Sequence, residues 1–192
     1  MELQQLARRL PGVIGAALAY DNPLEASWLT GATLEGEREM VVTRVFDAPR
    51  ELVFKAWTEA EALLQWWGPR VFPTRVSTVD LRPGGKWHYC MVGPEGQESW
   101  GIAKYREIVP PERLVYTDWF SNKEGEPVGK PMEMTVEFTA QGRGTLLRSR
   151  AVFESKEHRD EVISMGMEEG LSETLDRLDE YLVASAKPVG GR

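Results

Sequence analysis

Residues 131–153, with the sequence PMEMTVEFTAQGRGTLLRSRAVF, decide the fold. Apolar side chains occupy every second position of the first part: Met132, Met134, Val136 and Phe138. Polar residues fill most of the positions between them, and this period of two is typical of a strand with one buried and one solvated face. Residues 141–144 then supply two glycines for a turn, and a second strand follows over 144–153. The stretch therefore predicts an antiparallel hairpin.

The same pattern extends toward the N-terminus. Short alternating runs separated by Gly- and Pro-containing turns are typical of a meandering antiparallel sheet. One further strand, rich in valine, precedes them. The predicted strands are 38–46, 71–81, 85–92, 99–109, 113–120, 131–140 and 144–153. We therefore expect an antiparallel sheet of about seven strands.

Two short helices are predicted between the first and second strands. The segment Asp47-Ala48-Pro49 is a helix-start signal, so a helix is expected over 50–57. Thr58 and Glu61 have the spacing of a capping box, which predicts a second helix over about 59–67. Gly68-Pro69 ends it.

A long helix is predicted at the C-terminal end of the chain, over about 156–184. Its apolar residues recur at spacings of three and four, and acidic residues fill the opposite side. Gly166 and Gly170 lie four apart beside the apolar stripe, so we expect a dent in the helix surface that faces the sheet. Together with the sheet, this helix predicts an α+β domain over residues 37–186.

The ends of the chain are expected to lie outside that domain. Leu3, Leu6 and Leu10 share helical spacing before Pro11, which predicts a short helix within an N-terminal extension over residues 1–36. The rest of the extension is an arm that packs loosely, becomes ordered in a homodimer, or stays disordered. Residues 187–192 are expected to be a disordered tail.

Composition and charge exclude several classes of protein. The 192 residues carry a formal net charge of −7, and nine acidic residues and two arginines lie within residues 157–185. A basic stripe that would bind nucleic acid is missing from the sequence. The longest apolar run is far shorter than the roughly 20 residues of a membrane span. With a single cysteine, Cys90, an internal disulfide is impossible, which suits a cytoplasmic protein.

Catalytic and metal-binding motifs are not found. The sequence has no nucleophile elbow, phosphate loop, zinc-protease histidine pair or dinucleotide fingerprint. Its two histidines, His88 and His158, do not suggest a metal site, so we expect neither metal nor cofactor. His88 alternates with aromatic residues and is predicted to point outward, and His158 is predicted to be solvated.

Five phrases in order resemble one family: VFDAP at 45–49, LQWWGP at 64–69, LRPGGKW at 81–87, PERLVYT at 111–117 and GMEEGL at 166–171. They resemble bacterial homologues of the heat-shock-protein ATPase activator, an AHSA-like family in the SRPBCC or START-like helix-grip superfamily. The resemblance covers about residues 37–185. It implies a curved antiparallel sheet, two short helices and a long C-terminal helix that together enclose a cavity.

Two departures from the family pattern matter. The first 36 residues are too few to form the separate N-terminal domain with which the eukaryotic co-chaperone contacts its chaperone, so a chaperone contact is not expected. Leu171 stands where family members often have tryptophan, which would enlarge the cavity or alter its end.

Aromatic and methionine side chains are the candidate ligand contacts, because flexible thioethers adapt to ligands of varied shape. The alternative is ordinary core packing. The candidates are Trp66, Trp87, Tyr89, Met91, Tyr116, Met132, Met134, Met167 and Leu171. Tyr89, Tyr116, Asp118 and Arg148 are the candidate polar groups of the same site.

The sequence thus predicts a protein that binds a small, largely apolar molecule, lipid-like or aromatic, between sheet and helix. One alternative is a cyclase- or hydrolase-like enzyme that uses Asp118, Tyr116 or His88 as general acid or base. The other is a protein-interaction or chaperone-associated module of the stress response. We expect a binding protein rather than an enzyme.

Overall fold

The computed structural model of the protein describes residues 31–33 and 36–186. Its elements, in chain order, are β1 (Gly31–Thr33), β2 (Glu39–Phe46), α2 (Arg50–Thr58), α3 (Ala60–Trp66), β3 (Thr74–Val79), β4 (Lys86–Val92), β5 (Glu98–Val109), β6 (Arg113–Ser121), β7 (Pro127–Gln141), β8 (Gly144–Phe153), α4 (Lys156–Ser164) and α5 (Met167–Ala186). The expectations for residues 1–30 and 187–192 lie outside the described residues.

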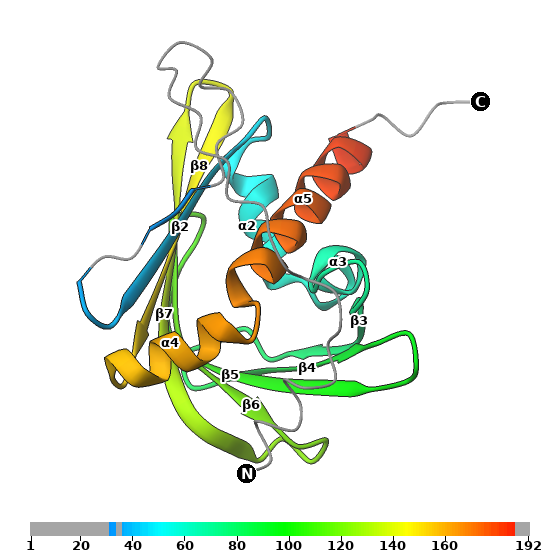
Figure 1. Cartoon of the computed structure of the whole chain (residues 1–192). Coiled ribbons are helices and arrows are strands. Elements are labelled where there is room, and N and C mark those ends of the chain that lie inside the picture. Colours follow the sequence, from blue (N-terminus) through cyan, green and yellow to red (C-terminus); the bar gives the residue numbers. More distant parts are fainter. Residues whose placement is uncertain (1–30, 34–35, 187–192) are drawn as a thin grey trace.

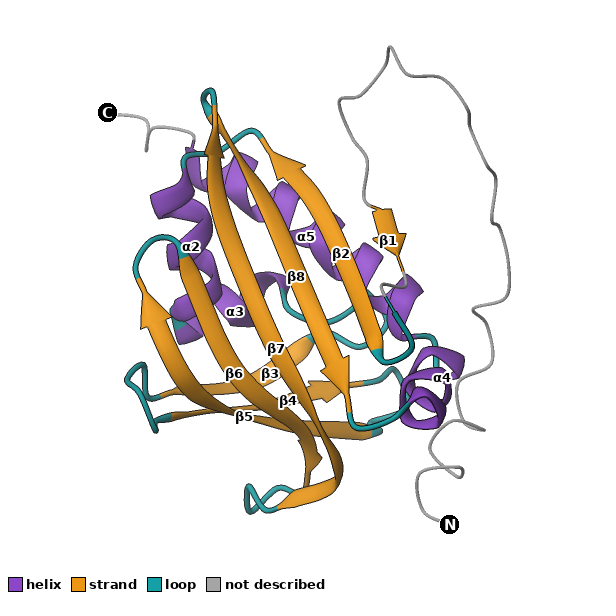
Figure 2. Cartoon of the chain, turned by 90° about the vertical axis from the view of Figure 1, so that its left-hand side faces the viewer, coloured by secondary structure: helices purple, strands orange, loops and turns teal. Residues whose placement is uncertain are grey.

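The eight described strands form one antiparallel sheet in the order β1-β2-β8-β7-β6-β5-β4-β3. It is strongly curved, and the helices pack on one side of it (Figure 1). Figure 2 shows the opposite, outer face of the sheet, with α2, α3 and α5 behind it and α4 beside it. The seven predicted strands are all present, and β1 adds a short edge strand that pairs with β2. This strand lies within the segment that we assigned to the N-terminal extension.

The hairpin of β7 and β8 forms as its sequence predicts. The two strands pair from Met132 with Phe153 to Gln141 with Gly144. Gly142 has a φ of +62°, which suits the first central residue of a tight hairpin turn. The predicted apolar positions face the helices, and Val136 and Phe138 are completely buried there. The register therefore places the whole apolar set of the hairpin in the core.

Helix α5 closes this core. Leu175, Leu178 and Leu182 are at most 2% exposed, and they belong to the apolar cluster that α5 shares with α2, α3 and the inner face of the sheet. Burial of each leucine contributes about 1.5–3 kcal/mol relative to an exposed side chain. The acidic residues cover the remaining surface of the helix, as its periodicity predicts.

The C-terminal helical segment is interrupted, whereas the sequence predicted one continuous helix. Helix α4 ends at Ser164, and α5 begins at Met167. Gly166 lies between them with a φ of +88°, and its N–H donates to the Ile163 carbonyl at 2.9 Å. This left-handed conformation is a common way to end a helix and is readily adopted only by glycine. The long helix itself is confirmed, with 20 residues in α5.

The predicted capping box before α3 does not form. The Thr58 hydroxyl donates to the Phe54 carbonyl at 2.9 Å, so it bonds to its own helix α2 instead of capping the next one. At the other end of α3, the Arg177 guanidinium of α5 donates to the carbonyls of Gln65, Trp67 and Gly68. These bonds satisfy carbonyls that a helix end leaves without partners, and they tie α3 to α5.

Candidate functional site

The inner face of β4 to β7 carries the aromatic and methionine side chains that we predicted as ligand contacts. Because strand residues alternate between faces, Trp87 and Tyr89 of β4 lie on the same side as Tyr116 of β6 and Met134 of β7. All nine candidates belong to one apolar cluster between the sheet and the helices. The structure therefore brings the predicted residues together, and their role as ligand contacts stays a prediction.

The candidates differ in how deeply they are buried. Six are buried: Trp66, Trp87, Tyr89, Tyr116, Met132 and Met134. The other three, Met91, Met167 and Leu171, are only partly buried against the cluster. Met167 and Leu171 lie at the start of α5, just after the helix break, and both are partly exposed there. Nothing lies within 4 Å of the position where a Cβ of Gly170 would be, and the dent that we predicted between Gly166 and Gly170 stays a prediction.

A chain of tryptophan rings forms one wall of the interior. The Trp67 ring lies 5.3 Å from Trp66 and 4.8 Å from Trp87, centroid to centroid, and both pairs are edge-on. The Trp66 indole N–H donates to the Ala56 carbonyl at 3.0 Å, and that of Trp87 donates to the Ser77 hydroxyl at 3.1 Å. Such edge-on pairs stabilise by about 0.5–1.5 kcal/mol beyond burial, so this wall is firmly placed.

Tyr89 lies flat across the inner face of the sheet. Its ring stacks on Trp87 at 4.4 Å, and a Cβ on Gly101 of β5 would lie 2.3 Å from the Tyr89 Cζ. Only a glycine at position 101 leaves room for the ring in this position. Burial raises the pKa of Tyr89 well above its usual value, and the nearby Asp118 carboxylate raises it further. Tyr89 is therefore a neutral phenol.

Asp118 of β6 is the charged residue among these aromatic side chains. It pairs with Ala103 of β5 and Met132 of β7, both buried on the inner face. The residue keeps some exposure, but its Oδ1 is fully enclosed and has no hydrogen-bond partner among the described residues. Burial raises the pKa of Asp118 to about 7, against a smaller opposing effect of the Trp119 backbone N–H. The carboxyl group can therefore gain or lose a proton near neutral pH.

Two other polar atoms in the interior are also enclosed without a hydrogen-bond partner. The Tyr105 hydroxyl and the Trp57 indole N–H are buried without a partner in the part of the chain that the structure describes. The Tyr105 ring lies 6.1 Å from that of Tyr116 and edge-on to it, and burial and Asp118 both raise the Tyr105 pKa. A buried polar group without a partner costs about 1–3 kcal/mol. These atoms thus keep hydrogen-bonding capacity that the described residues leave unused.

Three sequence predictions about polar residues had different outcomes. His88 points outward as predicted, and its Nε2 lies 3.2 Å from the Asn122 carbonyl oxygen. Arg148 was a candidate polar group of the interior, but it lies on the outer face, 3.5 Å from Glu137. His158 was predicted to be solvated, and this was wrong. It is buried against Phe153, and burial lowers its pKa.

Sequence reasoning missed Tyr105 and Arg44. Tyr105 follows Gly101 and Ala103 at period two on β5, and this alternation was a signal that could have placed it inside. Arg44 lies on β2, and its partner comes from α5, which the pattern of the strand alone does not indicate. Its guanidinium forms an ion pair of 2.5 Å with Asp176 under the helix.

Among the described residues, no three side chains of the types His, Cys, Asp and Glu are grouped so that they could hold a metal ion. Cys90 is buried, and burial raises the pKa of its thiol, so it is not an activated nucleophile. Among the helices of residues 31–33 and 36–186, none is long and apolar enough to cross a membrane.

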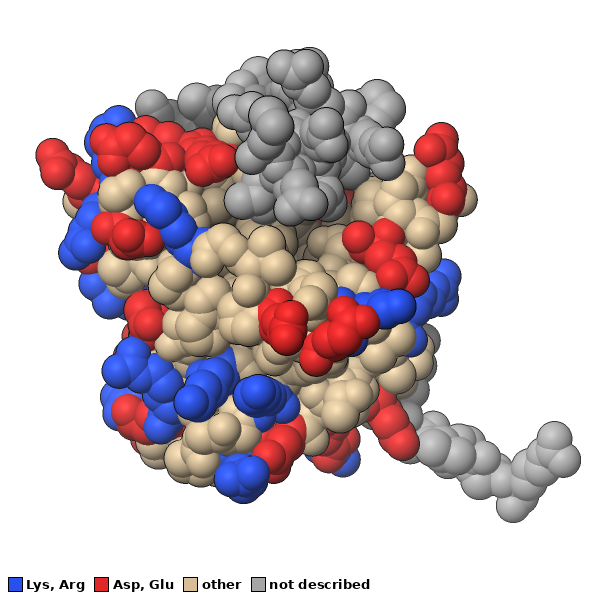
Figure 3. Space-filling model, turned by 90° about the horizontal axis from the view of Figure 1, so that it is seen from below, with Lys and Arg blue, Asp and Glu red and all other residues tan. Residues whose placement is uncertain are grey.

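The charge distribution of one face can be followed in Figure 3. Among the described residues in this view from below, lysines and arginines alternate with acidic residues instead of forming a continuous basic surface. Among the described residues, ion pairs such as Lys130–Glu154 and Lys156–Asp160 also join basic to acidic side chains. This face therefore offers no basic stripe for a phosphate backbone.

Comparison with known proteins identifies relatives of the whole domain. The family model for Activator of Hsp90 ATPase homolog 1-like protein matches residues 47–183. A solution structure of a protein from Arthrobacter aurescens is 27% identical, with a TM-score of 0.76 over 84% of this chain and 98% of that one. A crystal structure from Mycobacterium smegmatis is 25% identical, with a TM-score of 0.74 over 84% and 99%.

A more distant relative shares the fold. The crystal structure of an AHSA1 protein from Silicibacter pomeroyi is 22% identical, with a TM-score of 0.63 over 77% of this chain and 99% of that one. No curated protein matches the sequence.

Proposed function

The chain belongs to the family of Activator of Hsp90 ATPase homolog 1-like proteins, and we propose that it binds a small, largely apolar molecule between the inner face of the sheet and α5. The helix-grip fold is compatible with such binding. The observation that carries the proposal is the pair of enclosed polar atoms, Asp118 Oδ1 and the Tyr105 hydroxyl, within an aromatic interior. A core that served stability alone would gain from replacing them with apolar groups.

The chemistry of the interior suggests the kind of ligand. Aromatic rings and methionines offer an apolar surface, and Asp118 offers one acceptor that becomes a donor when protonated. A ligand that fits both has an apolar body and one hydroxyl or amine group. Met132, Met134 and Met167 are unbranched and adapt their conformation, so the interior can open around a guest without breaking the sheet. The partly buried start of α5 is the proposed entrance.

A neutral apolar fluorophore tests this proposal. N-phenyl-1-naphthylamine should increase in fluorescence with the parent protein and saturate. Met134→Trp places a bulky ring on the inner face of β7 and should abolish uptake while the protein stays folded. Met134→Leu keeps the volume of the side chain and is the matched control, which should bind the probe like the parent.

Two outcomes would contradict the proposal. If the parent takes up no probe and Met134→Trp is destabilised by about 1–3 kcal/mol, the interior is a solid core that the ring overpacks. If uptake survives Met134→Trp, the probe binds somewhere else on the protein. Circular dichroism and urea unfolding of each variant distinguish a lost site from a lost fold.

A second candidate function is general acid–base catalysis, and the pKa of Asp118 favours it. A catalytic acid or base works best when its pKa lies near the working pH. In this case Asp118 would transfer a proton to or from a bound substrate, with Tyr116 beside it. Asp118→Asn separates the two functions, because it removes proton transfer and keeps the shape of the site. A ligand recovered from the native protein by mass spectrometry would be bound by the variant but no longer converted.

A further inference from the structure

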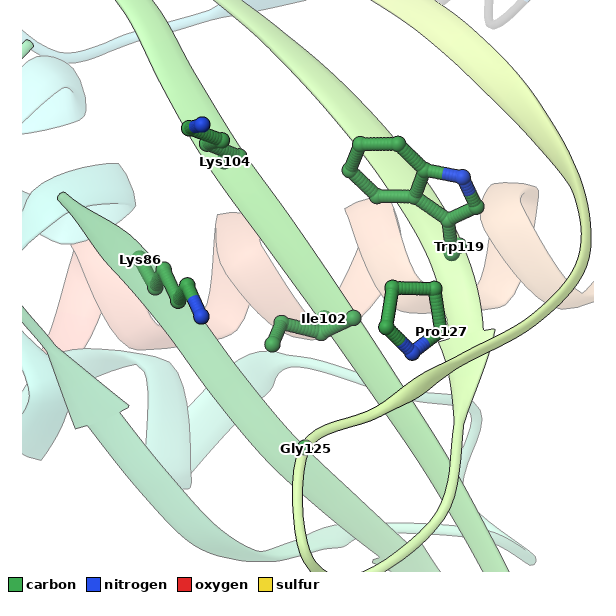
Figure 4. Close-up of a pocket in the computed structure, with 6 residues that line it drawn as sticks. All are labelled: Lys86, Ile102, Lys104, Trp119, Gly125 and Pro127. Carbon is green, nitrogen blue, oxygen red and sulfur yellow. The ribbon is translucent and has the colours of Figure 1, made fainter. Parts of the chain in front are cut away.

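A second concave site lies on the outer face of the sheet, away from α5. It is a pocket of about 170 Å³ lined by Lys86, Ile102, Lys104, Trp119, Gly125 and Pro127. Figure 4 shows the Lys86 side chain extended toward Ile102, with Trp119 and Pro127 on the other side. These residues come from β4, β5, β6, the turn between β6 and β7, and the start of β7. None of them belongs to the site proposed above.

The turn that forms one wall of the pocket is firmly held. The Asn122 side chain accepts from the Glu126 backbone N–H at 2.8 Å, and the Gly125 N–H donates to the Asn122 carbonyl at 3.0 Å. His88 binds the same carbonyl from the sheet below, at 3.2 Å. A Cβ on Gly125 would lie 3.5 Å from the Ile102 side chain, so the turn sits directly over the sheet. The hydrogen bonds of this turn therefore hold one wall of the pocket in a fixed position.

The two lysines of the pocket are opposite each other across β4 and β5. Like charges in directly opposite positions destabilise a sheet. Within the described part of the chain, neither ammonium group has a carboxylate within ion-pair distance. Nearby arginines on this face do have one: Arg106 pairs with Glu133 and Arg113 with Glu107. The lysine pair thus stands out as positive charge that the protein itself leaves uncompensated.

Carboxylates close to the pocket are already engaged elsewhere. Glu133 accepts from both Arg106 and the Thr117 hydroxyl. Glu126 accepts from the Asn122 amide within the turn. Both lysine side chains are exposed, so an anionic ligand can reach their ammonium groups from solution. Between the two lysines, the floor of the pocket is apolar, with Ile102 only 3% exposed.

We propose that this outer pocket binds a small organic anion whose carboxylate lies between Lys86 and Lys104 and whose flat apolar part lies against Ile102 and Trp119. Cavities of about 150 Å³ accommodate a single benzene ring, so a one-ring carboxylate fits the volume. The net charge of −7 repels anions at long range, and the two lysines attract them locally. The site thus selects ligands that have both the charge and the apolar surface.

Benzoate is the probe that tests the proposal, with benzamide as its uncharged counterpart. In ¹H–¹⁵N spectra, benzoate should cause saturable shifts at the backbone of residues 102, 104 and 125 and at the Trp119 indole N–H. Lys86→Gln and Lys104→Gln should each weaken binding by about fivefold, and benzamide should bind the parent more weakly by a similar factor. Lys123→Gln is the matched control, because Lys123 lies in the same turn, pairs with Glu124 at 3.8 Å and does not line the pocket.

Two results would overturn the proposal. Benzamide that binds as tightly as benzoate, together with lysine variants of unchanged affinity, would show that the pocket does not recognise charge. Shifts confined to interior groups such as the Trp87 indole N–H would place benzoate in the inner site. Met134→Trp distinguishes binding at the two sites. It should block the inner site and leave the benzoate shifts around Trp119 unchanged.

Discussion

Asp118 is an acidic side chain in an enclosed, aromatic environment, which is unfavourable for a residue with a purely structural role. Its Oδ1 is enclosed without a hydrogen-bond partner among the described residues, and Tyr89, Tyr105 and Tyr116 all lie close enough for its charge to raise their pKa values. Enclosure disfavours the charged carboxylate, so the protein holds a proton on Asp118 up to about pH 7. A neutral carboxyl group can donate a hydrogen bond as well as accept one.

Replacement of Asp118 by asparagine should stabilise the protein at alkaline pH. The folded-state pKa of about 7 lies above the ordinary value of 3.8, so the folded state binds more protons than the unfolded state between these pH values. Stability of the parent therefore falls as pH rises from about 4 to 7 and stays low above that. At 1.4 kcal/mol per pKa unit the cost is at most roughly 4 kcal/mol, and the partial exposure of Asp118 reduces it to about 1–3 kcal/mol.

Urea unfolding of the parent and Asp118→Asn at pH 8.5 and at pH 4.5 measures this effect. The variant should be more stable at pH 8.5, and the difference should shrink as pH approaches 4. Other groups, including the buried His158, titrate in both proteins and cancel in the difference. A difference that is equal at the two pH values would mean that the carboxyl group is solvated.

Single residues were also where sequence reasoning was weakest. Acidic and basic neighbours suggested that His158 is solvated, but its packing against Phe153 depends on how α4 returns to β8. Thr58 and Glu61 had the spacing of a capping box, yet the Thr58 hydroxyl found a nearer acceptor in α2. In both cases the local pattern was compatible with two outcomes, and contacts outside the pattern decided between them.

At the scale of elements, the two glycines near the start of α5 have different roles, so their replacement by alanine should have opposite effects. Gly166 has a φ of +88°, where a side chain costs about 1–2 kcal/mol, and Gly166→Ala should destabilise the protein by that amount. Gly170 lies within α5 with open space around it, and Gly170→Ala should stabilise the protein by up to about 1 kcal/mol. Urea unfolding of both variants measures the contrast. If Gly166→Ala is neutral, the break between α4 and α5 is absent in solution.

The junction of α3 and α5 gives a second prediction at this scale. Arg177→Met should cost about 1–2 kcal/mol, because three carbonyls at the end of α3 lose a charged donor. Arg70→Met is the matched control. Arg70 pairs with Glu180 of the same helix, but its side chain is 51% exposed, so its loss should cost less than about 1 kcal/mol. Thermal unfolding compares the two, and equal losses would mean that the bonds of Arg177 contribute no more than a surface ion pair.

Elements as such could be predicted well from the sequence. The alternation of apolar and polar residues identified all seven strands of the core sheet, because one face of each strand must be buried. The break in the last helix escaped prediction, since glycine within a helical pattern is compatible with either continuation or termination. Gly166 ends a helix and Gly170 does not, and nothing in the spacing distinguishes them.

At the scale of the whole molecule, each of the two proposed sites requires strands that are distant in sequence. Asp118 belongs to the inner site because Ala103 and Met132 flank it on neighbouring strands, and period two alone could not place it reliably. The outer pocket depends on the turn before β7, which bends over β4 and β5. Lys86 and Lys104 become neighbours only through strand register. The sequence could therefore predict the residue types of the inner site but not the existence of the outer one.

We expect the fold to unfold as a single cooperative unit because α5 closes the sheet. Truncation of the chain before α4 tests this expectation. A chain that ends at Ser155 lacks α4 and α5, so the apolar cluster on the inner face loses the side chains with which α5 covers it. It should be insoluble, or should lose its cooperative thermal transition, because the burial of Leu175, Leu178 and Leu182 alone contributes roughly 5–9 kcal/mol. This is comparable with the whole stability of an ordinary domain. A chain that ends at Ala186 is the matched control and should melt like the parent. A sharp transition in the shorter chain would mean that the sheet, α2 and α3 fold without their closing helix, and α5 would then be a cover for the inner site rather than part of the core.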